Sequence, residues 1–115
     1  MRGDWQVGVL IAQVNYIDWR VHPFRAERWL EIWEPALDRA LAFGAHTCFL
    51  SRSVEDPLHY RQVSVWERPD DFERYWASDE ITALREAALN YYNKPLAPNW
   101  HSLTSGSLVA ATSAA

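Results

Sequence analysis

Side chains in the middle of the sequence have the types and spacing that chemistry on a flat aromatic molecule needs. Along a strand expected at residues 59–67, alternate positions carry polar or aromatic groups: Tyr60, Gln62, Ser64 and Trp66. The helix expected next carries three aromatic residues at positions i, i+3 and i+4: Phe72, Tyr75 and Trp76. A following helix places Arg85 within an otherwise apolar stripe.

These groups suit the oxidation of a phenol, hydroquinone or anthrone by dioxygen without a cofactor. The deprotonated substrate donates an electron directly to dioxygen, so the protein supplies a dry pocket, a fixed orientation and a cation at the oxyanion. If the alternate face of the strand looks toward the helices, we expect Arg85, Trp66 and Gln62 to be catalytic, with Arg85 at the oxyanion. Preorganised donors of this kind contribute about 3 kcal/mol. The expected substrate contacts are Asn15, Tyr60, Phe72, Tyr75 and Trp76.

The same stretch resembles the antibiotic biosynthesis monooxygenase family of dimeric α+β barrels. The likeness lies in V-W-E, P-x-x-F-x-x-Y-W, S-D and L-R-E-A, and it covers about residues 7–104. It is nearest to the small cofactor-independent monooxygenases of aromatic polyketide pathways. The resemblance implies that these enzymes have a Trp at the position of Trp66 and an Arg at the position of Arg85. They have a Tyr where this chain has Phe72 and an Asn where it has Gln62. Two of the four are kept, and because Phe72 cannot donate a proton, that role passes to Tyr75 or Tyr60 or is lost.

Two alternatives stay open at this point. The first is a dimeric barrel that binds a small hydrophobic molecule, or only its partner, without turnover; Arg85 would then pair with Glu67 or Asp79. The second is a haem-binding or haem-degrading relative, because Asn15 and Trp76 resemble two residues of that branch of the superfamily. The position expected for its axial His falls at Leu84 or Arg85. For Asn15, strand-end solvation or bonding to backbone is also an alternative to a role in a site.

Composition narrows the class of protein. The chain has 115 residues, 49% of them apolar and 23% charged, which indicates one globular domain over residues 1–105 and a flexible tail over 106–115. The net charge of −4 argues against nucleic acid, and no apolar run approaches the roughly 20 residues that span a membrane. A lone Cys48, expected to be a buried thiol, and the absence of an export signal fit the cytoplasm. The histidine spacing suggests no metal site, and no cofactor motif is visible.

The hydrophobic pattern predicts an order of strand, helix, strand, strand, two helices and strand. The expected ranges are 6–16, 23–43, 45–53, 59–67, 69–77, 79–92 and 98–104, with a kink or break at Pro35. This order is the ferredoxin-like split βαβ arrangement, an α+β fold with a four-stranded antiparallel sheet. Charges along 27–39 indicate a solvated helix face. Helices should cover one sheet face, while the other carries Trp66 and associates with a second copy in a homodimer.

Overall fold

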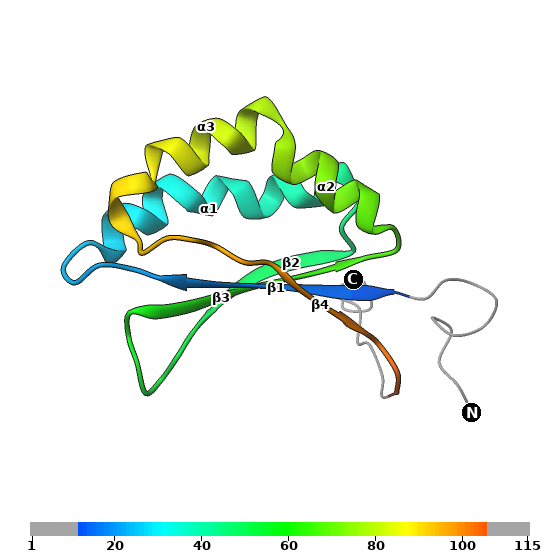
Figure 1. The fold of residues 1–115 in the computed structure, drawn as a ribbon, viewed down its shortest axis with the longest axis horizontal. Coiled ribbons are helices and arrows are strands. Elements are labelled where there is room, and N and C mark those ends of the chain that lie inside the picture. Colours follow the sequence, from blue (N-terminus) through cyan, green and yellow to red (C-terminus); the bar gives the residue numbers. More distant parts are fainter. Residues whose placement is uncertain (1–11, 106–115) are drawn as a thin grey trace, which may run out of the picture.

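A four-stranded antiparallel sheet with helices on one face forms the frame of the protein (Figure 1). The computed structural model describes residues 12–105. Its elements, in chain order, are β1 (Gln13–Arg20), α1 (Ala26–Phe43), β2 (Thr47–Arg52), β3 (His59–Trp66), α2 (Pro69–Ala77), α3 (Asp79–Ala87), the 3-10 helix η2 (Leu89–Tyr91) and β4 (Asn99–Ser102). The strand order β2-β3-β1-β4 confirms the predicted ferredoxin-like α+β fold. The expected tail at 106–115 lies outside the described residues.

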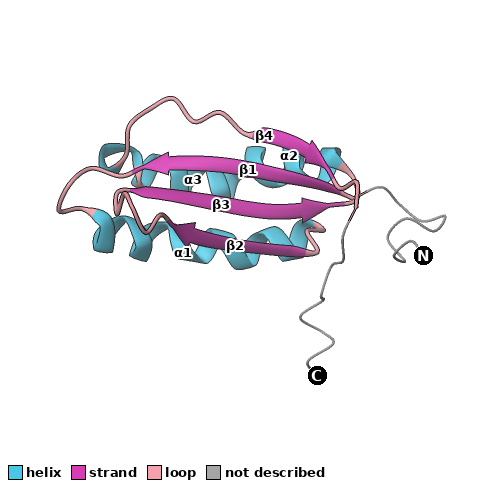
Figure 2. Cartoon of the chain, turned by 90° about the horizontal axis from the view of Figure 1, so that it is seen from below, coloured by secondary structure: helices cyan, strands magenta, loops and turns pink. Residues whose placement is uncertain are grey.

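The helices divide the covered face of the sheet between them. Figure 2 shows the sheet from its open side, with α1 behind the β2 edge and α2 and α3 behind the β1 and β4 side. Side chains from both layers form one large core cluster that includes Trp19 of β1 and Trp29 and Trp33 of α1. The Trp19 ring lies 5.1 Å from that of Trp29 and 4.7 Å from that of Trp33. Tightly packed indoles therefore join the sheet to α1.

The first strand lies further along the chain than expected. It starts at Gln13 within the described residues and pairs with β3 as far as Arg20 opposite His59, whereas the expected strand ends at residue 16. Asp18 resembles a turn residue, but it lies on the open sheet face, where its carboxylate accepts hydrogen bonds from Arg61 Nε at 2.9 Å and His59 Nε2 at 2.7 Å. Cross-strand partners therefore keep an acid in the strand. The expected residues 6–11 lie outside the described part.

Helix α1 continues through Pro35 as one element, so the two abutting segments expected there do not form. Proline removes one backbone hydrogen bond, but three fully buried residues on the sheet-facing side, Trp33, Ala36 and Ala40, hold the helix against the core on both sides of it. The helix ends at Gly44, whose φ of 120° is accessible mainly to glycine. The predicted stop at this glycine is confirmed.

Trp66 was expected on the face of β3 that points away from the helices, and it lies on the face that the helices cover. Gln62, Ser64 and Trp66 are fully buried beneath the helices, while Val63 and Val65 lie on the other face with Val14 of β1. The prediction that Trp66 lies on the face away from the helices is wrong. The physical reason is that the helix layer is itself rich in aromatic and polar partners, so it accepts an indole and an amide that pattern alone assigns to a semi-polar wall.

Candidate active site

Gln62 lies at the centre of a buried hydrogen-bond network. Its Oε1 accepts a hydrogen bond from Trp33 Nε1 at 2.7 Å, and its Nε2 lies 3.5 Å from the hydroxyl oxygen of Tyr75. The Tyr75 hydroxyl in turn donates to the carbonyl of Ala36 at 2.8 Å. Burial raises the pKa of Tyr75, so its hydroxyl keeps its proton at neutral pH. The expected catalytic amide is therefore fixed between α1 and α2.

Aromatic rings from β3, α2 and β4 pack together beside this network. Trp66 lies 5.7 Å from Phe72 and 5.8 Å from Tyr75 between ring centroids, and Trp66 Nε1 donates to Ser64 Oγ at 2.8 Å. Phe72 stacks on Trp76 at 5.6 Å with an interplanar angle of 17°. Four of the expected site residues, Trp66, Phe72, Tyr75 and Trp76, thus come together as one aromatic wall. The rings contact one another.

Arg85 is held against this wall by α3. Its guanidinium lies 4.5 Å from the centroid of the Trp76 ring, a cation–π contact. Its Nη2 donates to the Trp76 carbonyl at 2.8 Å and to Thr82 Oγ1 at 3.3 Å, while its buried Nε has no partner among residues 12–105. The alternative ion pair of Arg85 with Glu67 or Asp79 does not form: the hydrogen bonds of Arg85 go to Trp76 and Thr82, and Glu67 accepts from His46 Nε2 at 2.9 Å. In the described part of the chain Arg85 has no acidic partner.

Asn15 of β1 has an amide group of which both polar atoms lack a hydrogen-bond partner in residues 12–105. The residue is fully buried. Its neighbours across the sheet are Ser64 of β3 and Trp100 of β4, and the Trp100 ring lies 5.4 Å from that of Phe72. An unsatisfied buried amide costs about 1–3 kcal/mol. A partner from outside the chain would remove that cost.

Tyr60 does not belong to this cluster. It lies six residues before Trp66 on β3, a separation of roughly 20 Å along a strand. Its ring lies 5.0 Å from that of Trp29, and its buried hydroxyl has no hydrogen-bond partner in residues 12–105. The structure therefore brings seven of the eight expected site residues to one part of the helix-covered face and leaves Tyr60 at the other end of the strand.

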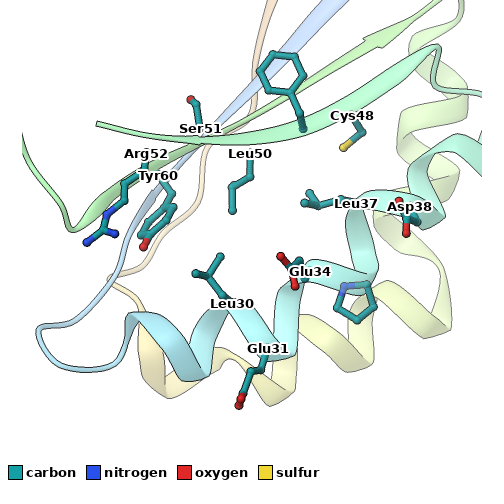
Figure 3. Close-up of a pocket in the computed structure, with 12 residues that line it drawn as sticks. Leu30, Glu31, Glu34, Leu37, Asp38, Cys48, Leu50, Ser51, Arg52 and Tyr60 are labelled. Carbon is teal, nitrogen blue, oxygen red and sulfur yellow. The ribbon is translucent and has the colours of Figure 1, made fainter. Parts of the chain in front are cut away.

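Sequence reasoning missed a cleft between α1 and β2, at the opposite edge of the sheet. Its volume is about 800 Å³, and Leu30 and Leu37 of α1 and Leu50 of β2 supply apolar lining (Figure 3). Tyr60 and the half-buried Cys48 line it too, and burial raises the pKa of Cys48 to about 12. The cleft exists because α1 and the edge strand β2 are held apart. The sequence gives no sign of that distance; it shows only that the helix side of the cleft carries a run of acids.

Residues 12–105 lack two structural features. No group of three metal-ligating side chains occurs there, and no helix is long and apolar enough to cross a membrane. The place expected for an axial haem ligand holds Leu84 and Arg85 on α3. These residues do not fit a haem iron, because neither side chain is an axial ligand of the usual kinds.

Solved structures share the fold of this chain, although no family model and no curated protein matches its sequence. A candidate antibiotic biosynthesis monooxygenase of Caulobacter crescentus CB15 has a TM-score of 0.74 at 13% identity, over 84% of this chain and 92% of that one. Its counterpart from Nitrosomonas europaea has a TM-score of 0.72 at 12% identity, over 78% and 88%. A conserved protein of Methanosarcina mazei Go1 reaches 0.72 at 13%, over 80% and 92%. The chain thus has the fold of the antibiotic biosynthesis monooxygenases, as its sequence predicted.

Proposed function

We propose that this protein is a cofactor-independent monooxygenase that oxidises an aromatic phenol, hydroquinone or anthrone of the polyketide type with dioxygen. The observation that carries the proposal is the amide of Asn15, which is fully buried on the helix-covered face and has no hydrogen-bond partner within residues 12–105. A substrate oxygen held there would satisfy the amide. The aromatic wall of Trp66, Phe72 and Trp76 lies on the same side of the sheet and would flank a flat ring system.

Arg85 would stabilise the oxyanion of the deprotonated substrate. Its Nε is the one guanidinium nitrogen that is buried without a partner, and the contacts of Nη2 with Trp76 and Thr82 hold the group in a fixed orientation. The enolate then transfers an electron to dioxygen, the substrate radical and superoxide combine to a peroxide anion, and a proton from solvent converts it to the hydroperoxide. Loss of water from an anthrone hydroperoxide gives the quinone. A dry, aromatic surrounding strengthens the attraction between Arg85 and the oxyanion.

Phe72 and Tyr75 limit how protons move in this site. Phe72 has no hydroxyl, and the Tyr75 hydroxyl is committed to the Ala36 carbonyl with its pKa raised by burial. Tyr60 lies at the other end of β3. The substrate would therefore lose its proton to solvent before it meets dioxygen, which favours substrates that are acidic enough to form an enolate near neutral pH.

Binding without turnover is the second candidate function. It is favoured by the bonds that Arg85 already makes to its own helix layer and by the contact of the aromatic rings with one another. In that case the Asn15 amide would hold a polar group of a ligand that leaves unchanged.

Oxygen uptake by metal-stripped, flavin-free protein tests the two candidates. The substrates are a small panel of anthrones and naphthohydroquinones, with Arg85→Ala and Asn15→Ala as variants. Arg74→Ala is the matched control, because Arg74 is an exposed arginine whose partner is Asp71 on its own helix. Uptake above the uncatalysed rate that falls about a hundredfold in Arg85→Ala but not in Arg74→Ala supports catalysis. Ligand binding without uptake supports the second candidate.

The open face of the sheet supports the proposal of a homodimer. Val63 lies opposite Phe49 of β2, whose side chain is 48% exposed, and both therefore share the face away from the helices. Val14 and Val65 lie on the same face but are themselves buried, each 5% exposed, so Phe49 is the large apolar side chain that this face leaves exposed in the described part of the chain. A second copy packed on this face would cover Phe49 and join two sheets across a twofold axis.

A further inference from the structure

We propose that the cleft between α1 and β2 binds a small amphipathic amine, with its ammonium between Glu34 and Asp38 and its apolar body on Leu37 and Leu50. The cleft lies at the β2 edge of the sheet, away from α2 and α3 (Figure 2). Its volume of about 800 Å³ falls in the range of small-molecule sites. The proposal is independent of the oxygenase chemistry, which is proposed for another part of the helix-covered face.

The floor of the cleft is apolar and its residues are only partly covered by the protein. Leu30, Leu37 and Leu50 are half-buried and pack against the main core, and Figure 3 shows Leu30 and Leu50 directed toward each other across the opening. Burying the remaining surface of such side chains contributes about 25 cal/mol per Å². A flat or aliphatic body would therefore be held here without any displacement of the core.

Two free carboxylates stand at the α1 side of the cleft. Glu34 and Asp38 are four residues apart on α1 and so lie on one helix face. Neither has a hydrogen bond or ion pair among the described residues, whereas Glu31 accepts from Arg28 at 3.0 Å. In Figure 3 the Glu34 carboxylate is directed into the cleft and that of Glu31 away from it. One ammonium group satisfies both free acids with charge-assisted hydrogen bonds.

Tyr60 gives the second, independent sign of a ligand. The residue is 3% exposed, lines the cleft and has a hydroxyl without a hydrogen-bond partner in residues 12–105. Figure 3 shows this hydroxyl on the cleft side, beside Leu30. A hydroxyl both donates and accepts, so it can bond a ligand oxygen at the end away from Asp38. The ligand class that meets all three features is an arylalkylamine with a polar oxygen on its ring.

Three matched probes separate these contributions: tyramine, phenethylamine, which lacks the ring hydroxyl, and 3-(4-hydroxyphenyl)propanoate, which reverses the charge. Binding is measured by titration calorimetry and located from backbone amide shifts in nuclear magnetic resonance spectra. We expect tyramine to bind with shifts at Leu37 and Leu50, phenethylamine to bind several-fold more weakly, and the propanoate to bind at least about tenfold more weakly. No binding of tyramine at millimolar concentration would overturn the proposal.

Variants of the acids test whether charge carries the selectivity. The double variant Glu34→Gln with Asp38→Asn should weaken tyramine binding about tenfold and leave the propanoate no weaker than before. The matched control is Glu73→Gln with Glu86→Gln, which removes the same net charge from exposed acids on α2 and α3. Equal weakening by the two double variants would show a long-range charge effect and overturn the assignment of this cleft.

Tyr60→Phe tests the other end of the site. The change should bring the affinity for tyramine down to that for phenethylamine and leave phenethylamine itself unaffected, because only tyramine has a hydroxyl to bond. Circular dichroism confirms that each variant is folded. An equal loss for both amines would place the hydroxyl outside the site and contradict the proposed orientation.

Discussion

Gln62 shows how one buried side chain fixes several neighbours. Its amide accepts from the Trp33 indole at 2.7 Å while fully buried between α1 and the sheet. Replacing it with a similarly sized apolar residue, Gln62→Leu, leaves that indole N–H without a partner. We expect the free energy of unfolding to fall by about 1–3 kcal/mol, measured by urea denaturation.

A double-mutant cycle with Trp33→Phe separates the hydrogen bond from the packing around it. Trp33→Phe removes the donor, so Gln62→Leu should cost less in that background than in the native protein. A cost that is equal in both backgrounds would mean that the bond contributes nothing to stability.

Cys48 should react slowly with alkylating agents. Burial raises its pKa from an ordinary value of 9.0 to about 12, and only the thiolate is nucleophilic. Alkylation by iodoacetamide should therefore rise about tenfold per pH unit and continue to rise well above pH 9.0. Protein unfolded in urea is the control, since its thiol titrates normally and the rate levels off earlier. An early plateau in the folded protein would contradict the effect of burial.

For single residues, the sequence predicted local roles better than it predicted contact partners. Ser78 is a residue type that caps helices, and its Oγ accepts from the Ile81 N–H at 3.3 Å at the start of α3. Arg85 and Trp76 were expected near one another, but not the cation–π contact at 4.5 Å. Helix signals are local, whereas partners such as Trp33 and Gln62 are 29 residues apart and meet only when α1 crosses the sheet.

The end of α1 depends on a glycine that no other residue replaces easily. Gly44 has a φ of 120°, and a methyl group added there would lie 2.9 Å from Asp71 Oδ2 on α2. We expect Gly44→Ala to lower the free energy of unfolding by about 1–3 kcal/mol through backbone strain and this contact.

A double variant, Gly44→Ala with Asp71→Ala, separates backbone strain from the close contact in the same denaturation experiment. The double variant should regain only the part due to the close contact, since the backbone strain remains. Full recovery would show that φ at this position costs nothing.

The boundaries of the elements were predictable where a local signal marks them, and not elsewhere. Pro69 starts α2 and Gly44 ends α1 as expected, because each sets the backbone by itself. The end of β1 was predicted too early, and the break that was one of two expectations at Pro35 does not occur. Tertiary partners keep Asp18 in β1 and hold α1 together across the proline. The face of β3 that packs under the helices was assigned wrongly for the same reason: it depends on what α1 and α2 offer.

The proposed dimer makes a prediction for the whole molecule. Phe49→Glu places a charge on the open sheet face and should raise the dimer dissociation constant by a factor of ten or more, measured by sedimentation equilibrium. Phe24→Glu is the matched control, because Phe24 lies fully exposed in the turn before α1. A native protein that sediments as a monomer at all concentrations would exclude this interface.

The overall architecture followed from the order of elements, but the α1–β2 cleft did not. The order of strands and helices fixes which elements are neighbours, while the width of the space between α1 and β2 depends on how Leu30, Leu37 and Leu50 pack. The charge pattern of α1 indicates that its acids face solvent, but it does not indicate that Glu34 and Asp38 border a cleft.

The packed indoles of the core also have an optical consequence. Trp19, Trp29 and Trp33 are fully buried. The Trp19 ring lies 5.1 Å from that of Trp29 and 4.7 Å from that of Trp33, at tilts of 52° and 50°. Electronic transitions of rings at such distances mix, and the mixing gives strong circular dichroism only while the rings keep one mutual orientation. The near-ultraviolet spectrum therefore reports directly on whether α1 remains seated on the sheet, and it would fade in a state that keeps its helices but loses its packing.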